Sequence, residues 1–314
     1  MIFKYEYRNK LHEGNVTWEL DNQYKVIDCE ICGFKHIVPF PTEESLNDFY
    51  SEAYFEKDRE NYFNQVKEEI NWLNFTYENF YELIEKHMNP LGGGAEKKLL
   101  EIGSGHGHFL FMGKEKGWNV LGFEPSKIAF EYSKRHGCKV INDVFKTDLI
   151  SEKFDLVILN HVLEHVNEAP KMIENIKTIL NTDSLLLISS PNDFNPLQVF
   201  LQKERDFNPY WIAPSLNDQP PHHINYFDFD SVEKLLKKSG FEVLEKSVSF
   251  PMELFLLIGS NYIKNEDIGK KSHNFVKKLE MNLKEYDDKV LIDLTNLFVE
   301  NKIGRSFVIL ARLK

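Results

Sequence analysis

The chain has 314 residues, of which 42% are hydrophobic and 28% are charged, a composition typical of a globular protein with a full core. Its formal net charge of -11 excludes a general nucleic-acid-binding protein, which would carry a basic surface. The N-terminus lacks the apolar segment of a signal peptide, no apolar run approaches the ~20 residues that span a bilayer, and three cysteines are too few for a disulfide framework. We therefore expect a cytoplasmic protein with reduced cysteines and no nucleic-acid or membrane partner.

Residues 1–57 are predicted to form a separate N-terminal module, because they show little helical periodicity. The module contains one C-x-x-C pair, Cys29 and Cys32, which is followed by His36. The pair is compatible with a metal site or with two buried thiols. A redox pair is less favoured, since the motif does not precede a helix of a βαβ unit.

A long helix rich in aromatic residues is predicted over 59–88, within a linking segment that spans 58–92. Its aromatic side chains are expected to belong mainly to the core. A proline and three glycines in the run 89–94 end the helix and mark the clearest linker of the chain.

The rest of the chain alternates apolar strands with helices, which predicts a doubly wound, mostly parallel α/β sheet of seven strands. The core comprises 93–250 and 304–314, with strands near 98–102, 119–124, 139–142, 154–159, 184–190, 241–248 and 306–310. Two insertions exceed a minimal core, an aromatic one at 192–227 and a mostly helical one at 251–303. Ligands bind beyond the carboxyl ends of such strands, so we expect the first insertion to shape the substrate site. The second caps that site or contacts a second copy in a homodimer.

Three alternating glycines, Gly103, Gly105 and Gly107, directly follow the first strand of this core. Because glycine lacks a Cβ atom, such a turn lets backbone approach a ligand closely. The dinucleotide pattern requires a small residue where His108 stands, and the lysine of a phosphate-binding P-loop is missing. Glu124 follows about 20 residues later, at the offset where an acid meets ribose hydroxyls.

Five motifs follow one another in this α/β alternation. They are the glycine motif at 101–107, Glu124 after the second strand, the run 154–165, the Pro191-Asn192 loop and the run 239–243. In this order they resemble class I S-adenosylmethionine (SAM)-dependent methyltransferases, over roughly residues 97–250 plus the last strand. The resemblance implies a Rossmann-like sheet and SAM as cofactor. The cofactor-binding residues that it implies are Glu101, Gly103, Gly105, Gly107, Glu124, Asp143 and Asn160, although Asp143 could equally be an ordinary loop acid.

Three histidines are candidates for a general base, His223 first and then His161 and His165. In a helix, His161, Glu164 and His165 would share one face. The run is also an H-x-x-E-H zinc-protease signature, but its place after a parallel-type strand speaks against a protease. A divalent metal at this run and a purely structural role for Glu164 and His165 stay open.

The segment 39–50 resembles the N-terminal module of bacterial methyltransferases that modify sugars, a module similar to a zinc ribbon. Its first cysteine pair is missing here, so a four-ligand zinc site would have to use Cys29, Cys32, His36 and His12. The resemblance implies O-methylation of a nucleotide-linked or phosphorylated sugar in surface polysaccharide or natural-product biosynthesis. A phenolic, quinone-like or amine acceptor and a non-catalytic SAM-binding module remain alternatives.

Overall fold

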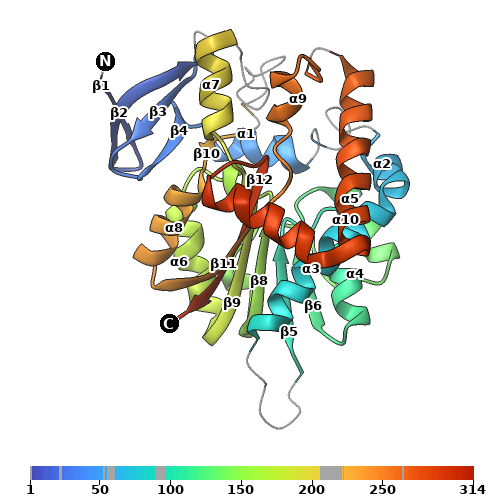
Figure 1. Cartoon of the computed structure of the whole chain (residues 1–314). Helices are drawn as coiled ribbons and strands as arrows, with labels where there is room; N and C mark the ends of the chain where they lie inside the picture. Colours follow the sequence, from blue (N-terminus) through green and yellow to red (C-terminus); the bar gives the residue numbers. More distant parts are fainter. Residues whose placement is uncertain are drawn as a thin grey trace.

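A computed structural model describes residues 2–20, 23–51, 54, 61–88, 96–205, 221, 223–263 and 265–314. A twisted sheet of seven strands forms the centre, in the order β11-β12-β9-β8-β5-β6-β7 (Figure 1). These strands are β5 (Lys98–Ile102), β6 (Asn119–Phe123), β7 (Val140–Ile141), β8 (Phe154–Asn160), β9 (Leu180–Pro191), β11 (Phe241–Val248) and β12 (Ser306–Leu313). The strands β5 to β9 run parallel, and β12 lies antiparallel between β9 and β11. The predicted fold class is confirmed.

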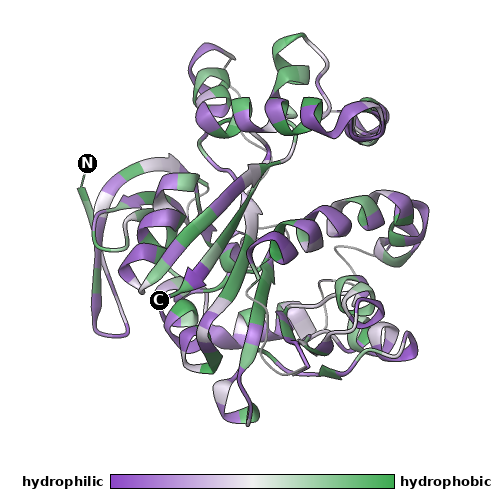
Figure 2. Cartoon of the chain, turned by 60° about the horizontal axis from the view of Figure 1, so that its bottom comes forward, coloured by the Kyte–Doolittle hydropathy of each residue, from purple (hydrophilic) through white to green (hydrophobic). Residues whose placement is uncertain are grey.

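Both faces of this sheet are covered by helices, which explains the long apolar runs in its strands. Along β8, Leu156 and Ile158 pack into the cluster of α3 and α4, whereas Val157 and Leu159 pack into the cluster of α6 and α8. The flanking helices are α3 (Ile70–His87), α4 (His108–Glu115), α5 (Lys127–Arg135), α6 (Ala169–Ile179) and α8 (Phe229–Lys238). Figure 2 shows hydrophobic residues concentrated in the strands between them.

The N-terminal module is a second, antiparallel sheet in the order β1-β2-β3-β4-β10, followed by the short helix α1 (Glu43–Asp48). Its first four strands are β1 (Ile2–Tyr7), β2 (Lys10–Glu19), β3 (Lys25–Cys29) and β4 (Phe34–Val38). The fifth strand, β10 (Asn225–Tyr226), comes from the insertion after β9 and pairs with β4. The module and the insertion therefore share one sheet, a pairing that a two-residue strand does not reveal in the sequence.

The linking segment forms two helices in place of the predicted single one, α2 (Tyr62–Glu68) and α3, with a break at Glu69. The break lets α2 turn toward the glycine loop, where Tyr62 lies 5.7 Å from the ring of His106, while Tyr81 of α3 stacks on Phe109 of α4.

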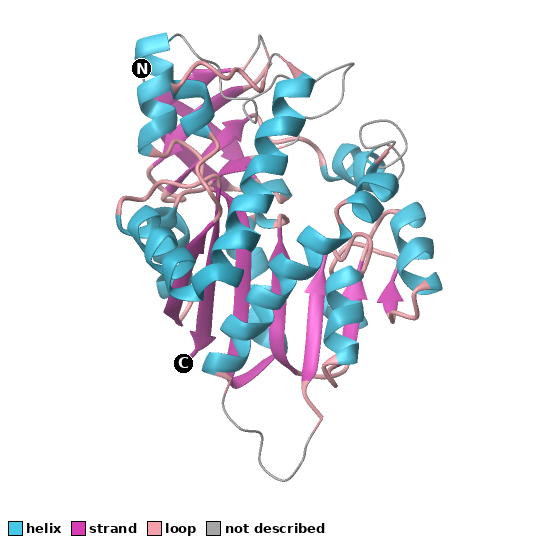
Figure 3. Cartoon of the chain, turned by 45° about the vertical axis from the view of Figure 1, so that its right-hand side comes forward, coloured by secondary structure: helices cyan, strands magenta, loops and turns pink. Residues whose placement is uncertain are grey.

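The two insertions are mainly helical in their described parts, with α7 (Pro196–Arg205), α9 (Glu253–Leu257) and the 35-residue α10 (Glu266–Glu300). Helix α10 is kinked at Asp287 and crosses the molecule beside α3 (Figure 3). Within the described ranges, the structure has no helix long and apolar enough to cross a membrane.

Candidate active site

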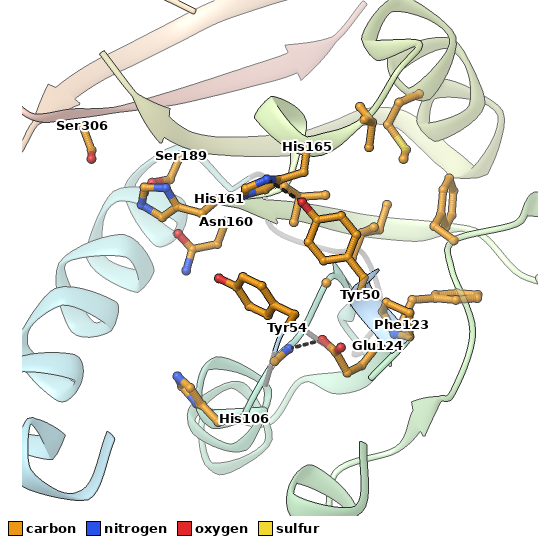
Figure 4. A pocket seen from close by; sticks show the side chains of 18 of the residues that line it. Tyr50, Tyr54, His106, Phe123, Glu124, Asn160, His161, His165, Ser189 and Ser306 are labelled. Carbon is orange, nitrogen blue, oxygen red and sulfur yellow. Dashed lines mark hydrogen bonds between the residues drawn. The ribbon is translucent and has the colours of Figure 1, made fainter. Parts of the chain in front are cut away.

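A cavity of about 1210 Å³ lies at the carboxyl ends of β5, β6 and β8. Its lining contains five of the seven residues predicted to hold the cofactor, namely Gly103, Gly105, Glu124, Asp143 and Asn160. Figure 4 shows Glu124 and Asn160 facing this space from different strands. The sheet topology brings these residues together because all of them follow parallel strands that end at one edge.

The glycine loop turns on three left-handed residues, with φ of 70° at Gly103, 52° at Gly105 and 72° at Gly107. A Cβ atom on Gly103 would lie 2.7 Å from Val162, and one on Gly107 would lie 2.7 Å from the hydroxyl of Ser133. Side chains at these two positions would therefore be strained and would also clash. Gly107 does not line the cavity itself but allows the turn into α4.

The carboxylate of Glu124 fixes the shape of this loop. One oxygen accepts the backbone N–H of Gly105 at 2.7 Å, and the other accepts that of Ser126 at 2.8 Å. Burial raises the pKa of Glu124 to about 7, against the opposing effect of these two donors. A buried acid on the cavity wall is suited to accept hydrogen bonds from ligand hydroxyls.

Glu101 and Asp143 have contrasting surroundings. Glu101 is 3% exposed, its Oε2 has no hydrogen-bond partner among the described residues, and burial followed by the charge of Glu124 raises its pKa. Glu101 does not belong to the described cavity lining, but an orphaned acid of this kind suits an amino group of a ligand that reaches it. Asp143 is already paired, since it accepts from the Lys146 ammonium at 2.7 Å and from the Val144 N–H at 2.8 Å.

The loop after β8 does not continue as a helix, so His161, Glu164 and His165 do not share a helical face. His161 has a left-handed φ of 55°, and only residues 163–165 form a short 3-10 turn. The turn still places Nδ1 of His161 3.0 Å from Oε1 of Glu164, and Nε2 lies 3.4 Å from the hydroxyl of Ser189. A strained backbone at a polar residue is a feature of functional sites.

Glu164 is fully buried and orients its neighbours. Its second oxygen accepts the Ser190 hydroxyl at 3.0 Å, and its backbone carbonyl accepts the N–H of Ile224. Burial alone would raise the pKa of Glu164, but the hydrogen bond from His161 and the charges of His165 and His161 lower it to about 2. Glu164 is therefore an anion that holds His161 in one orientation.

The other two candidate bases lie beside this pair. His165 lines the cavity, and its Nδ1 is 2.8 Å from the hydroxyl of Tyr50, which the N-terminal module contributes (Figure 4). The ring of His223 lies 5.1 Å from that of His165 and does not belong to the described lining. Donor atoms of Glu164, His165 and His223 fall within 4.8 Å of one another, but both oxygens of Glu164 already accept hydrogen bonds.

Sequence reasoning missed several lining residues. Tyr50, Tyr54, Tyr62, His106 and Ser189 all border the cavity. Tyr50 closes the recognised segment 39–50, which was a usable signal. His106 lies within the predicted glycine turn, whereas the places of Tyr62 and Ser189 depend on how α2 and β9 pack.

The predicted zinc ligands of the N-terminal module do meet. One donor atom from each of Cys29, Cys32, His36 and His12 lies within 4.8 Å of the others. Nδ1 of His12 is 3.1 Å from Nε2 of His36 and 3.4 Å from Sγ of Cys32. The hydrogen bond between the two thiols lowers the pKa of Cys29 and, together with burial, raises the pKa of Cys32. Two sulfurs and two imidazoles in a buried cluster fit a tetrahedral zinc ion.

Comparison with known proteins identifies the family of the chain. A family model described as a methyltransferase domain matches residues 75–246, more than half of the chain. The chain belongs to the SAM-dependent methyltransferases.

Relatives of this methyltransferase differ in the share of the chain that they match. A ubiquinone biosynthesis O-methyltransferase of Actinobacillus pleuropneumoniae is 29% identical over 123 residues, which is 35% of this chain and 51% of that protein. The methyltransferase thus spans about half the length of this relative. An uncharacterized protein of Methanocaldococcus jannaschii is 25% identical over 202 residues, which is 62% of this chain and 87% of that protein.

A solved structure extends the likeness to most of the fold. Magnesium protoporphyrin IX methyltransferase from Synechocystis, crystallised with bound S-adenosylhomocysteine (SAH), superposes with a TM-score of 0.51 at 14% identity. The match covers 87% of this methyltransferase and 100% of that chain. At this identity the likeness concerns the fold alone.

Proposed function

We propose that this methyltransferase transfers a methyl group from SAM to a hydroxyl of an uncharged, sugar-type small molecule. The observation that supports it best is the pair formed by His161, which lines the cavity directly after Asn160, and the buried Glu164. A histidine held by a buried carboxylate is the arrangement of an activated general base.

The residues around the glycine loop fit SAM. Glu124 would accept the ribose hydroxyls, the unpaired oxygen of Glu101 would face the amino group, and Gly103 and Gly105 would let the backbone approach. When bound, SAM supplies an electrophilic methyl group on a sulfonium. Asn160 and Asp143 line the same space and complete the proposed cofactor set.

His161 is placed to take the proton of an acceptor hydroxyl. Glu164 accepts from Nδ1, which leaves the lone pair of Nε2 for a proton. The Ser189 hydroxyl is a weak partner of Nε2 at 3.4 Å, so an incoming hydroxyl can replace it. His165 and His223 then act as positioning residues for this loop, and the hydroxyl of Tyr50 holds His165 by a hydrogen bond.

Charges along the cavity favour an uncharged acceptor over the nucleotide-linked or phosphorylated sugar expected from the sequence. The described lining contains seven acids and two lysines. Lys146 is paired with Asp143 at 2.7 Å and Lys171 with Glu168 at 3.6 Å. An acceptor phosphate would therefore meet no unpaired lysine or arginine in this described lining, and its charge would be repelled.

A phenolic or quinone-like acceptor is the second candidate, because Trp72, Phe75 and Phe80 give one wall of the cavity an aromatic surface. Incubation with SAM and matched panels of neutral sugars, nucleotide sugars and catechols, followed by mass spectrometry, separates these classes. We expect methylated product from the neutral sugars. Product from nucleotide sugars or catechols alone would contradict the proposal, and SAM binding without any turnover would favour a non-catalytic module.

Cofactor affinity should depend on pH through Glu124. Hydroxyls that donate to this carboxyl stabilise its deprotonated form, whereas its pKa in the free protein is about 7. Below pH 7 a proton must leave before the ligand binds, so affinity for SAH should fall by up to roughly tenfold per pH unit. Calorimetry between pH 6 and 8 measures this slope, and Glu124→Gln should flatten it. An equal slope in the variant would assign the titration to another group.

We also propose that Cys29, Cys32, His12 and His36 hold one structural zinc ion. Protein purified without a histidine tag should contain about one zinc per chain, and Cys29→Ser should lose the metal and melt roughly 5 °C or more below the parent. Cys138→Ser is the matched control, because Cys138 lies in the α3–α4 cluster. Full zinc content in Cys29→Ser, or no zinc in the parent, would reject the site.

A further inference from the structure

The cavity extends from the cofactor site into a lobe between α3 and α10, floored by the ends of β11 and β12. We call this part the α3–α10 lobe and define it by Trp72, Phe75, Phe80, Ser249, Glu280 and Ser306. In Figure 4, Ser306 lies beyond His161 on the side away from Tyr50 and Glu124. The lobe therefore begins where the acceptor atom must stand and leads away from the proposed cofactor position.

One wall of the lobe is a single face of α3. Eight residues of this helix line the cavity. Six of them, at 72, 75, 76, 79, 80 and 83, have the spacing of one helical face, and Leu73 and Tyr77 border that face. The rings of Trp72 and Phe75 stack at 5.3 Å with an interplanar angle of 25°. The buried hydroxyl of Thr76 has no hydrogen-bond partner among the described residues. This wall is thus an aromatic platform with one unused polar atom.

The opposite wall is polar. Oε1 of Glu280 accepts the N–H of Phe250 at 3.1 Å, and no other hydrogen bond to this side chain is found in the described parts of the chain. Ser247, Ser249 and Ser306 add hydroxyls from the ends of β11 and β12. Burial raises the pKa of Glu280 to about 7, against the effect of the Phe250 donor.

Ion pairs at the rim of the lobe connect its two walls, and they engage the lysines nearest to Glu280. Lys277 and Lys284 lie about one helical turn before and after Glu280 on α10. Lys277 pairs with Glu69, and Lys284 pairs with Glu82 at 2.6 Å. Glu280 consequently presents an oxygen to the lobe without an ion pair of its own among the described residues.

We propose that the α3–α10 lobe is the acceptor subsite and that it binds an uncharged ring bearing several hydroxyls. The apolar face of the ring would lie on Trp72 and Phe75, while a hydroxyl would donate to Glu280. A flat phenol could use the aromatic wall but would offer fewer hydroxyls to Glu280, which accepts only the N–H of Phe250 among the described residues. This inference rests on the proposed function and names the surface that selects its substrate.

The test uses the full chain saturated with SAH and a panel of methyl glycopyranosides, with catechol as the flat comparison probe. Ligand-observed NMR should detect at least one glycoside, and Glu280→Gln and Trp72→Ala should each weaken it about tenfold or more. Glu285→Gln makes the same change at an exposed position of α10 and should leave binding unaltered. SAH affinity should stay within twofold in every variant.

Two results would overturn the inference: unaltered glycoside binding in both lobe variants, or catechol binding while no glycoside binds. If Glu280→Gln fails to fold, the test uses two variants of Trp72 instead. Trp72→Phe keeps an aromatic ring and should bind the glycoside more tightly than Trp72→Ala. A failure of the proposed function looks different, because then SAH itself does not bind or no acceptor is methylated.

Discussion

Replacing Glu124 with alanine is expected to weaken SAH binding by on the order of 100-fold or more. The reason is that hydrogen bonds to a charged group contribute about 1.5–3 kcal/mol each, and two ribose hydroxyls would lose this acceptor. The glycine loop would lose a second support, because Glu124 also accepts from Gly105 and Ser126. Titration calorimetry of the parent and the variant measures the difference.

Two further variants separate recognition from loop support. Glu115→Ala removes an exposed acid from the end of α4 that lies away from the loop, and it should leave SAH affinity unchanged. Glu124→Gln keeps one oxygen for a backbone donor and should bind more tightly than Glu124→Ala but more weakly than the parent. An affinity of Glu124→Ala within threefold of the parent, with the melting temperature preserved, would remove Glu124 from the cofactor site.

Loss of the His161 imidazole should reduce the methyl-transfer rate by ~10²–10⁴-fold at saturating SAM, which is the usual contribution of a general base. SAH affinity should change little, since no hydrogen bond of His161 reaches the glycine loop or Glu124 in the described structure. His136→Ala, an exposed histidine on the far end of α5, serves as the control. The measurement is SAH formation with the acceptor identified in the substrate panel.

Parallel variants at His165 and His223 rank the three candidate bases. We expect His161→Ala to lose the most activity, because its ring is held by Glu164 on the cavity wall. We expect His223→Ala to lose the least, since its ring does not belong to the described cavity lining. Glu164→Gln should impair the rate as well and shift its pH profile. A loss below threefold for His161→Ala, beside a large loss for His223→Ala, would restore the order favoured by the sequence.

The sequence predicted the central sheet well because its inner strands β5, β8, β9 and β12 are largely buried on both faces and contain continuous apolar runs. Each strand of the sheet lies within a few residues of its predicted position; β8, for example, spans Phe154–Asn160. The meeting of the four proposed zinc ligands was also predictable, since β2, β3 and β4 are neighbouring antiparallel strands that bring residues close in sequence together.

Features that depend on local backbone conformation or on pairing between distant segments were not predictable from the sequence. The two residues of β10 join a strand about 190 positions earlier, and nothing in Asn225 or Tyr226 announces this. The left-handed turn at His161 cannot be read from the residue type, because histidine adopts such a φ only where the surrounding structure imposes it. The charge of the cavity also emerges only in three dimensions, since its acids come from widely separated elements.

A crystal structure of the full chain with bound SAH tests the central claim most directly. We predict that both ribose hydroxyls lie about 3 Å from the carboxylate of Glu124 and that the sulfur faces His161 at the mouth of the α3–α10 lobe. SAH bound elsewhere, or bound with its sulfur turned away from His161, would contradict the account.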